Sequence, residues 1–165
     1  MLVFLDTEFS DFILSDLISI ALVSEDGREF YAERTDYNRN ACSSFVHDTV
    51  IPLLGRVPDA ACERAELSKR LHAWFEDLPE PATVIFDYSE DAVLLDKALG
   101  GRLPPNAVQR LHLDTYAITH PVFEDASDAV YTYDLPAHHA LADARALMAG
   151  YRAWHPFMER IRGIR

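Results

Sequence analysis

A short apolar run near the start of the chain, residues 2–5, leads directly into the acidic residues Asp6 and Glu8. Four consecutive apolar residues are typical of a strand that is buried on both faces of a sheet. Residues i and i+2 of a strand point to the same face, so the two carboxylates are expected to project together. Such a pair is either solvated, where the strand leaves the sheet, or held by a proton or a cation between the two charges.

The rest of the chain alternates between strand-like and helix-like patterns. Apolar strand candidates cover residues 17–23, 29–32, 83–86 and 110–113. The first two follow residues 2–5 through short connections, which favours a three-strand antiparallel meander. With the later strands, the chain is predicted to form an α/β fold with a mixed sheet of about five strands, flanked by helices.

Helices are expected where apolar residues recur at intervals of three and four. A helix should end where proline or glycine interrupts that pattern. The predicted helices cover residues 45–54, 59–76, 89–99, a brief segment before Pro121 and residues 139–154, whereas residues 122–137 show no clear period and are predicted to be a loop.

Length and composition narrow the class of protein. A chain of 165 residues matches one domain, so residues 1–165 are expected to form a single domain. No basic stretch precedes the first strand, and Cys42 and Cys62 give neither a disulfide framework nor a cysteine zinc site, so a cytoplasmic protein is expected. No apolar run reaches the roughly 20 residues of a membrane helix. The net charge of −12 excludes coating of DNA through a basic surface, but permits nucleic-acid binding through metal ions held by carboxylates.

Three further acidic residues lie at the ends of predicted strands or the starts of predicted helices. Asp87 follows the strand at residues 83–86, and Asp91 lies in the first turn of the next helix. Each has a simpler explanation, as a turn residue or as a first-turn dipole partner worth under roughly 1 kcal/mol. Asp143 lies on the apolar face of the last helix, where a carboxylate is costly unless it is paired or binds a metal. His138 is placed to reach the same site, or to cap the helix beside a solvated Asp143.

Together, these residues match the pattern of a known family. Residues 6–9, Asp-Thr-Glu-Phe, and residues 138–143, His-His-Ala-Leu-Ala-Asp, resemble the first and third motifs of the DEDDh family of 3′→5′ exonucleases. The resemblance covers essentially the whole chain and implies the ribonuclease H-like fold. The form of the first motif and the compact size resemble the small stand-alone exoribonuclease branch. The residues that match the family's catalytic set are Asp6, Glu8, Asp91, Asp143 and His138.

The second motif departs from the family pattern. In the family, this motif often reads His-Asn-x-x-Phe-Asp, whereas residues 86–91 of this chain read Phe-Asp-Tyr-Ser-Glu-Asp. Its position relative to the helix matches Asp91 to the family's aspartate, with Asp87 as the alternative metal ligand. In the third motif, counting back five residues from Asp143 selects His138, and His139 is then the variable position.

The resemblance implies hydrolysis of the terminal phosphodiester of single-stranded RNA, with release of nucleoside 5′-monophosphates. Carboxylate ligands without sulfur suit a pair of Mg²⁺ or Mn²⁺ ions, which can activate water and stabilise the leaving group. On this hypothesis Asp6 bridges both ions, and Glu8 and Asp143 each support one. Asp91 holds the second ion largely through water. His138 is the candidate general base, because imidazole titrates near neutral pH.

Substrate contacts and partners are less clearly indicated. Thr7, Phe9 and Tyr88 are candidate substrate-binding residues, since an aromatic ring that stacks on a base contributes roughly 1–3 kcal/mol. Phe12 fits either that role or the core. Related small exonucleases imply a homodimer. The alternatives are a 3′→5′ DNA exonuclease, a non-catalytic ribonuclease H-like module that binds nucleic acid or protein, and a metal-dependent phosphatase.

Overall fold

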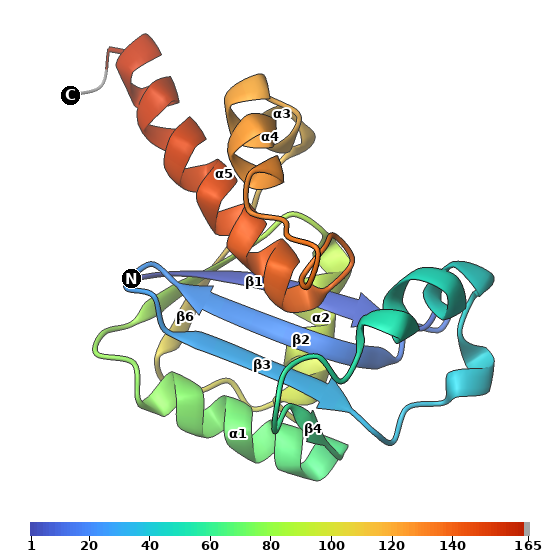
Figure 1. Ribbon diagram of the computed structural model, residues 1–165. Helices are drawn as coiled ribbons and strands as arrows, with labels where there is room; N and C mark the ends of the chain where they lie inside the picture. The colour runs from blue at the N-terminus through green and yellow to red at the C-terminus, as the bar shows by residue number, and fades with distance from the viewer. Residues whose placement is uncertain (164–165) are drawn as a thin grey trace.

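The computed structural model describes residues 1–163, except for the side chain of Val108, and contains one mixed six-stranded sheet (Figure 1). The strand order is β4-β3-β2-β1-β5-β6. Strands β1, β2 and β3 form an antiparallel meander, whereas β5 and β6 run parallel to β1. The strands are β1 (Leu2–Phe9), β2 (Leu17–Ser24), β3 (Glu29–Arg34), β4 (Ala61–Cys62), β5 (Ala82–Phe86) and β6 (Ala107–His112).

Helices cover both faces of this sheet. In Figure 1, α1 and α2 lie on one face, and α5 crosses the other and extends beyond the sheet with α3 and α4 beside it. The two faces have separate apolar clusters, which include Leu5 on the α1 side and Phe4 on the α5 side. The helices are α1 (Arg64–Glu76), α2 (Ser89–Ala98), α3 (Thr115–Ile118), α4 (Pro121–Asp128) and α5 (Ala140–Ile161).

The predicted fold class is confirmed, with one strand more than expected. Strand β1 lies between β2 and β5 and is buried on both faces at Val3, Phe4 and Leu5. The additional strand is the two-residue β4, which pairs with the end of β3. That a single domain spans residues 1–165 stays a prediction.

Two of the predicted element boundaries are wrong. The expected loop at residues 122–137 contains α4, because Pro121 fits the first helical turn and His120 accepts a hydrogen bond from the N–H of Val122. The helix expected from residue 59 begins only at Arg64, since Ala61–Cys62 is used as β4. The spacing of apolar residues does not reveal α4, because this helix buries only Phe123 as a large apolar residue.

Two other helical segments differ in form from the prediction. Residues 45–54 form a π-helical turn, Val46–Val50, followed by a 3₁₀ turn, Ile51–Leu53, with Pro52 at its start. The last helix continues past residue 154 through Pro156 to Ile161. Among the helices of residues 1–163, none combines the length and apolar character needed to span a membrane.

Candidate metal centre and catalytic site

The first part of the site is the carboxyl end of β1. Side chains alternate along this strand: Phe4 packs in the cluster on the α5 side, whereas Val3 and Leu5 pack toward α1 and α2. By the same alternation, Asp6 and Glu8 project to the α5 face. The predicted common orientation of these two carboxylates therefore agrees with the packing of the strand.

Helix α5 supplies the next part of the site. Small residues let it approach the sheet closely, since Ala140 and Ala144 pack against Ala21 of β2. Ala21 is the register partner of Asp6 across the β1–β2 pair. Asp143, in the first turn of α5, is thereby brought to the face on which Asp6 lies.

The acidic residues gather in two adjacent groups. Ligand atoms of Asp6, Asp87 and Asp91 all lie within 4.8 Å of one another. Ligand atoms of Glu8, His138 and Asp143 form a second group with the same limit of 4.8 Å. The structure thus brings together every residue of the predicted catalytic set, and it places both Asp87 and Asp91 beside Asp6.

Burial and mutual repulsion raise the pKa values of these carboxyl groups. Burial, followed by the charges of neighbouring acids, raises the pKa of Glu8 to about 8 and that of Asp6 well above its ordinary value. Burial raises the pKa of Asp91 to about 7, against an opposing hydrogen bond from Thr7. The pKa values of Asp87 and Asp143 are also raised, mainly by burial.

Unpartnered oxygens show that this cluster fits divalent cations. Oδ2 of Asp6 and Oδ2 of Asp91 are buried and have no hydrogen-bond partner in the structure. A buried carboxylate oxygen without a donor is costly, and a cation removes that cost. An all-oxygen set of ligands favours Mg²⁺ or Mn²⁺ over softer metals.

The two candidate ligands of the second motif are held differently. Asp91 is only 2% exposed, and its Oδ1 accepts a 2.6 Å hydrogen bond from Oγ1 of Thr7. Asp87 is held through its backbone, because Nε2 of His112 lies 2.9 Å from the Asp87 carbonyl oxygen. Both side chains remain able to serve the ion beside Asp6.

His138 lies at the rim of the site and is exposed. Its backbone has a left-handed conformation, with φ of 67°, and its N–H donates to Oδ2 of Asp143 at 2.9 Å. The ring meets that of Phe45 edge-on, with centroids 5.0 Å apart. The imidazole therefore has a defined place beside Glu8 and Asp143.

His139 has a different environment. It is 2% exposed, its ring stacks on Tyr31 with centroids 4.7 Å apart, and neither ring nitrogen has a hydrogen-bond partner. Burial lowers its pKa from 6.5 to about 4. Of the two adjacent histidines, only His138 joins a carboxylate group within the described residues.

Two cavities meet at the carboxylates. One, of about 430 Å³, is bordered by the acidic residues and by an aromatic wall. In that wall, Phe9 and Tyr88 have nearly parallel rings, and the ring of Phe12 meets both edge-on. Phe12 is 78% exposed, which excludes the core role considered for it. Thr7, Phe9 and Tyr88, the predicted substrate contacts, all line this cavity.

The second cavity, of about 420 Å³, lies beside α4 and α5 and contains a residue that the sequence did not single out. Tyr131 and Asp143 line this cavity together, and the Tyr131 hydroxyl opposes the rise in pKa that burial imposes on the Asp143 carboxylate. Burial raises the pKa of the Tyr131 phenol as well. Tyr131 follows α4 in a segment without periodicity, so no local pattern marked it.

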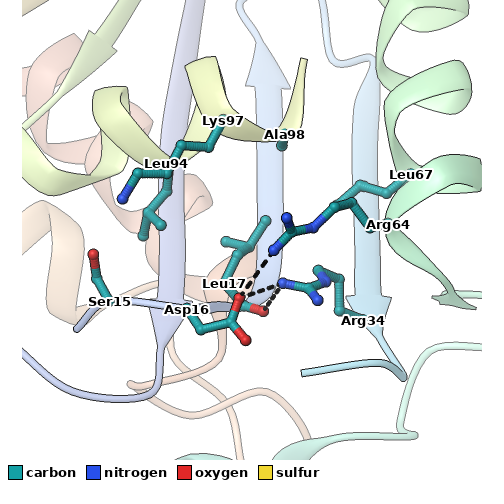
Figure 2. Close-up of a pocket in the computed structure, with 9 residues that line it drawn as sticks. All are labelled: Ser15, Asp16, Leu17, Arg34, Arg64, Leu67, Leu94, Lys97 and Ala98. Atoms are coloured by element: carbon teal, nitrogen blue, oxygen red, sulfur yellow. Dashed lines mark hydrogen bonds and ion pairs between the residues drawn. The ribbon is translucent and has the colours of Figure 1, made fainter. Parts of the chain in front are cut away.

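A network of ion pairs braces the loop that carries Phe12. Figure 2 shows Asp16 receiving hydrogen bonds from two guanidinium groups, those of Arg34 at 2.5 Å and Arg64 at 3.5 Å. Arg34 also pairs with Asp36 at 2.9 Å. The N–H of Ser10 donates to the Asp16 carbonyl, which closes the loop. These contacts hold the two ends of the loop together, and Phe12 lies between them.

Comparisons with known proteins agree with this architecture. No family model matches the chain. A 3′-5′ exoribonuclease of Mycobacterium tuberculosis, represented by two strains, is 46% identical over 52 residues. The matched segment covers 31% of this chain and 31% of each relative.

Solved structures resemble the chain over nearly its whole length. Schizosaccharomyces pombe Pop2p, in its Mg²⁺- and Mn²⁺-bound form, has a TM-score of 0.61 and 17% identity, covering 96% of this chain and 83% of Pop2p. Escherichia coli exonuclease I in complex with a dT13 oligonucleotide has a TM-score of 0.55 and 14% identity, covering 97% of this chain and 42% of the enzyme. The resemblance to the DEDDh-type exonucleases indicated by the sequence motifs is thus confirmed in the fold.

Proposed function

We propose that this chain is a metal-dependent 3′→5′ exonuclease that removes nucleoside 5′-monophosphates from single-stranded nucleic acid, with RNA preferred. The observation that carries the proposal is the pair of adjacent acidic groups at the end of β1, which together contain the whole predicted catalytic set. Phosphodiester hydrolysis needs an activated water and a neutralised phosphate. A pair of divalent ions supplies both when bound between such groups.

Different residues would bind each of the two ions. Asp6 belongs to the group with Asp87 and Asp91 and borders both cavities, so it would contact both ions. Asp91, or Asp87, would hold one of them from the side of α2 and β5. Glu8 and Asp143 would hold the other. The pKa values of these acids are raised, and a carboxylate must lose its proton to bind a cation, so ion binding would release protons and would strengthen as pH rises.

His138 is assigned the role of general base. Its ring is exposed, lies within the same group as Glu8 and Asp143, and is anchored through its backbone N–H. The imidazole would take the proton from the attacking water on the solvent side of the site. General-base catalysis contributes about 10²–10⁴-fold in rate.

The aromatic cavity is assigned to the 3′-terminal nucleotides. Phe12 and Tyr88 expose ring surface next to the carboxylates, and a stacked base contributes roughly 1–3 kcal/mol. Single-stranded ends are favoured because a base must leave its duplex neighbours to enter this cavity. Thr7 and Phe9 complete the proposed substrate contacts.

The preference for RNA rests on the exoribonuclease with a 46% identical segment, and a DNA exonuclease is the second candidate because the chain resembles exonuclease I with bound dT13. A 5′-labelled single-stranded oligoribonucleotide and its matched DNA strand would separate them. With Mn²⁺ or Mg²⁺ we expect a ladder that shortens from the 3′ end, faster on RNA, and none with EDTA. Faster digestion of DNA would favour the second candidate.

Matched variants test the site. Asp6→Asn should abolish the ladder and His138→Gln should lower kcat about 10²–10⁴-fold. The controls Asp96→Asn and His155→Gln make the same changes outside the site, at side chains that are about half exposed. Full activity of Asp6→Asn, or activity on a generic phosphomonoester without any on oligonucleotides, would contradict the proposal.

Light scattering tests the proposed homodimer.

A further inference from the structure

The middle residue of the Asp-Thr-Glu motif points away from the carboxylates on either side of it. Thr7 is buried, and its Oγ1 donates a 2.6 Å hydrogen bond to Oδ1 of Asp91. This bond joins residues 84 positions apart and links β1 to the first turn of α2. The first and second motifs are thus connected by a direct contact between side chains.

This contact settles how the Asp91 carboxylate is turned. Oδ1 is engaged by Thr7, whereas Oδ2 is buried and unpartnered, in the group that Asp91 forms with Asp6 and Asp87. Without the hydroxyl, the plane of the carboxylate could turn about the Cβ–Cγ bond, and neither oxygen would then be held toward Asp6. Because the hydroxyl is a neutral donor, the bond leaves the formal negative charge of the ionised carboxylate in place.

Asp87 lacks an equivalent support. Among the described residues, no side chain donates a hydrogen bond to its carboxylate, and its link to His112 is through the backbone carbonyl. Of the two candidates of the second motif, Asp91 is therefore the one whose side chain is oriented in advance.

We propose that Thr7 is a positioning residue, which holds Asp91 so that its free oxygen faces the metal site shared with Asp6. The inference rests on the proposed function only in taking Asp91 as a metal ligand. Residues that hydrogen-bond to metal ligands typically contribute 10–100-fold in metal affinity or activity. Thr7 acts through Asp91, and this role is separate from its predicted contact with substrate.

Substitutions at Thr7 can separate the hydroxyl from the shape of the side chain. Thr7→Val keeps the volume and the β-branch but removes the donor, whereas Thr7→Ser keeps the donor. Thr83→Val is a matched control, because Thr83 lies on β5 beside Leu2, at the opposite end of β1 from the site. Mn²⁺ binding to the free protein is measured by calorimetry, and thermal melts with EDTA show that each variant is folded.

We expect Thr7→Val to weaken Mn²⁺ binding about 10-fold or more, and Thr7→Ser and Thr83→Val to bind within a few-fold of the wild type. In oligonucleotide digestion, Thr7→Val should need more metal for half-maximal rate but approach the wild-type kcat at saturating Mn²⁺. Such recovery separates positioning from a substrate contact, whose loss would raise KM for the oligonucleotide at every metal concentration.

Wild-type Mn²⁺ affinity in a folded Thr7→Val variant would overturn the proposal. Equal loss in Thr7→Val and Thr7→Ser would also overturn it, because shape rather than the hydroxyl would then matter. If the wild type binds Mn²⁺ in a Thr7-dependent way but does not shorten oligonucleotides, the proposed exonuclease activity fails and the role of Thr7 stands.

Discussion

The backbone N–H of His138 donates to Oδ2 of Asp143 at 2.9 Å, so the candidate base and a candidate metal ligand are fixed to each other. Asp143→Asn can keep an oxygen acceptor for this bond while removing the charge. We expect a stability within about 1 kcal/mol of the wild type but a loss of activity of several orders of magnitude. Asp143→Ala should lose activity and also loosen the loop that carries His138. Thermal melts and digestion kinetics distinguish the two variants, and an active Asp143→Asn enzyme would refute the ligand role.

The acidic cluster makes the stability of the metal-free protein depend on pH. The pKa values of Glu8, about 8, and Asp91, about 7, lie above their ordinary values, so the folded state binds more protons than the unfolded state. The free energy of unfolding therefore falls as pH rises from about 4.5 to 8. In EDTA, we expect the melting temperature to fall between pH 6.5 and 8, and Mn²⁺ to restore it. Asp91→Asn should reduce this fall. An unchanged dependence of the melting temperature on pH would contradict the link between the acidic cluster and stability.

At lower pH, the titration of His139 gives stability the opposite dependence on pH. Its pKa is about 4 in the folded protein and 6.5 ordinarily, so protonation favours the unfolded state and stability falls as pH falls from 6.5 toward 4. His139→Phe keeps an aromatic ring on Tyr31 and removes the titration. Relative to the wild type, this variant should gain on the order of 1–3 kcal/mol between pH 6.5 and 4.5. Chemical denaturation at both pH values measures the difference; a constant difference would show that His139 does not titrate in this range.

Gly150 of α5 lies against α4, where there is no room for a side chain. A Cβ at this position would collide with the ring of Phe123 and lie 2.5 Å from Oγ of Ser127. Gly150→Ala gains about 1 kcal/mol of helix propensity but incurs an overpacking penalty of about 1–3 kcal/mol, so net destabilisation is expected. Phe123→Leu in the same chain should recover part of the loss. A more stable Gly150→Ala protein would show that α4 can move without penalty.

Phe12 should contribute to substrate binding through its exposed ring. Phe12→Ala is expected to raise KM for an oligoribonucleotide roughly 5- to 150-fold, the equivalent of a lost stacking contact of about 1–3 kcal/mol. Ile13→Ala is the matched control, because Ile13 is also exposed on the same loop but does not line the aromatic cavity. Equal effects of the two changes would point to a general role of the loop surface instead.

The features that could be predicted from the sequence are those that depend on local periodicity. The apolar run before Asp6 identified a central strand, and the helical face around Asp143 placed its carboxylate toward the core. Helix α4 could not be identified in this way, because a proline and a histidine cap start it and its apolar face is small. The partners of Thr7 and Tyr131 depend on tertiary contacts that leave no local pattern.

The alternation of β1 places a constraint on how this chain can vary. Asp6 and Glu8 face α5 while Thr7 between them faces α2, so three successive residues serve both sides of the sheet. Inserting or deleting one residue within the strand would send the carboxylates into the apolar layer and the threonine toward the metal. Substitutions elsewhere on the surface are compatible with the site, but the length of β1 up to Glu8 is not free to change. Among homologues, gaps should therefore be absent from this strand and concentrate in loops such as residues 129–137.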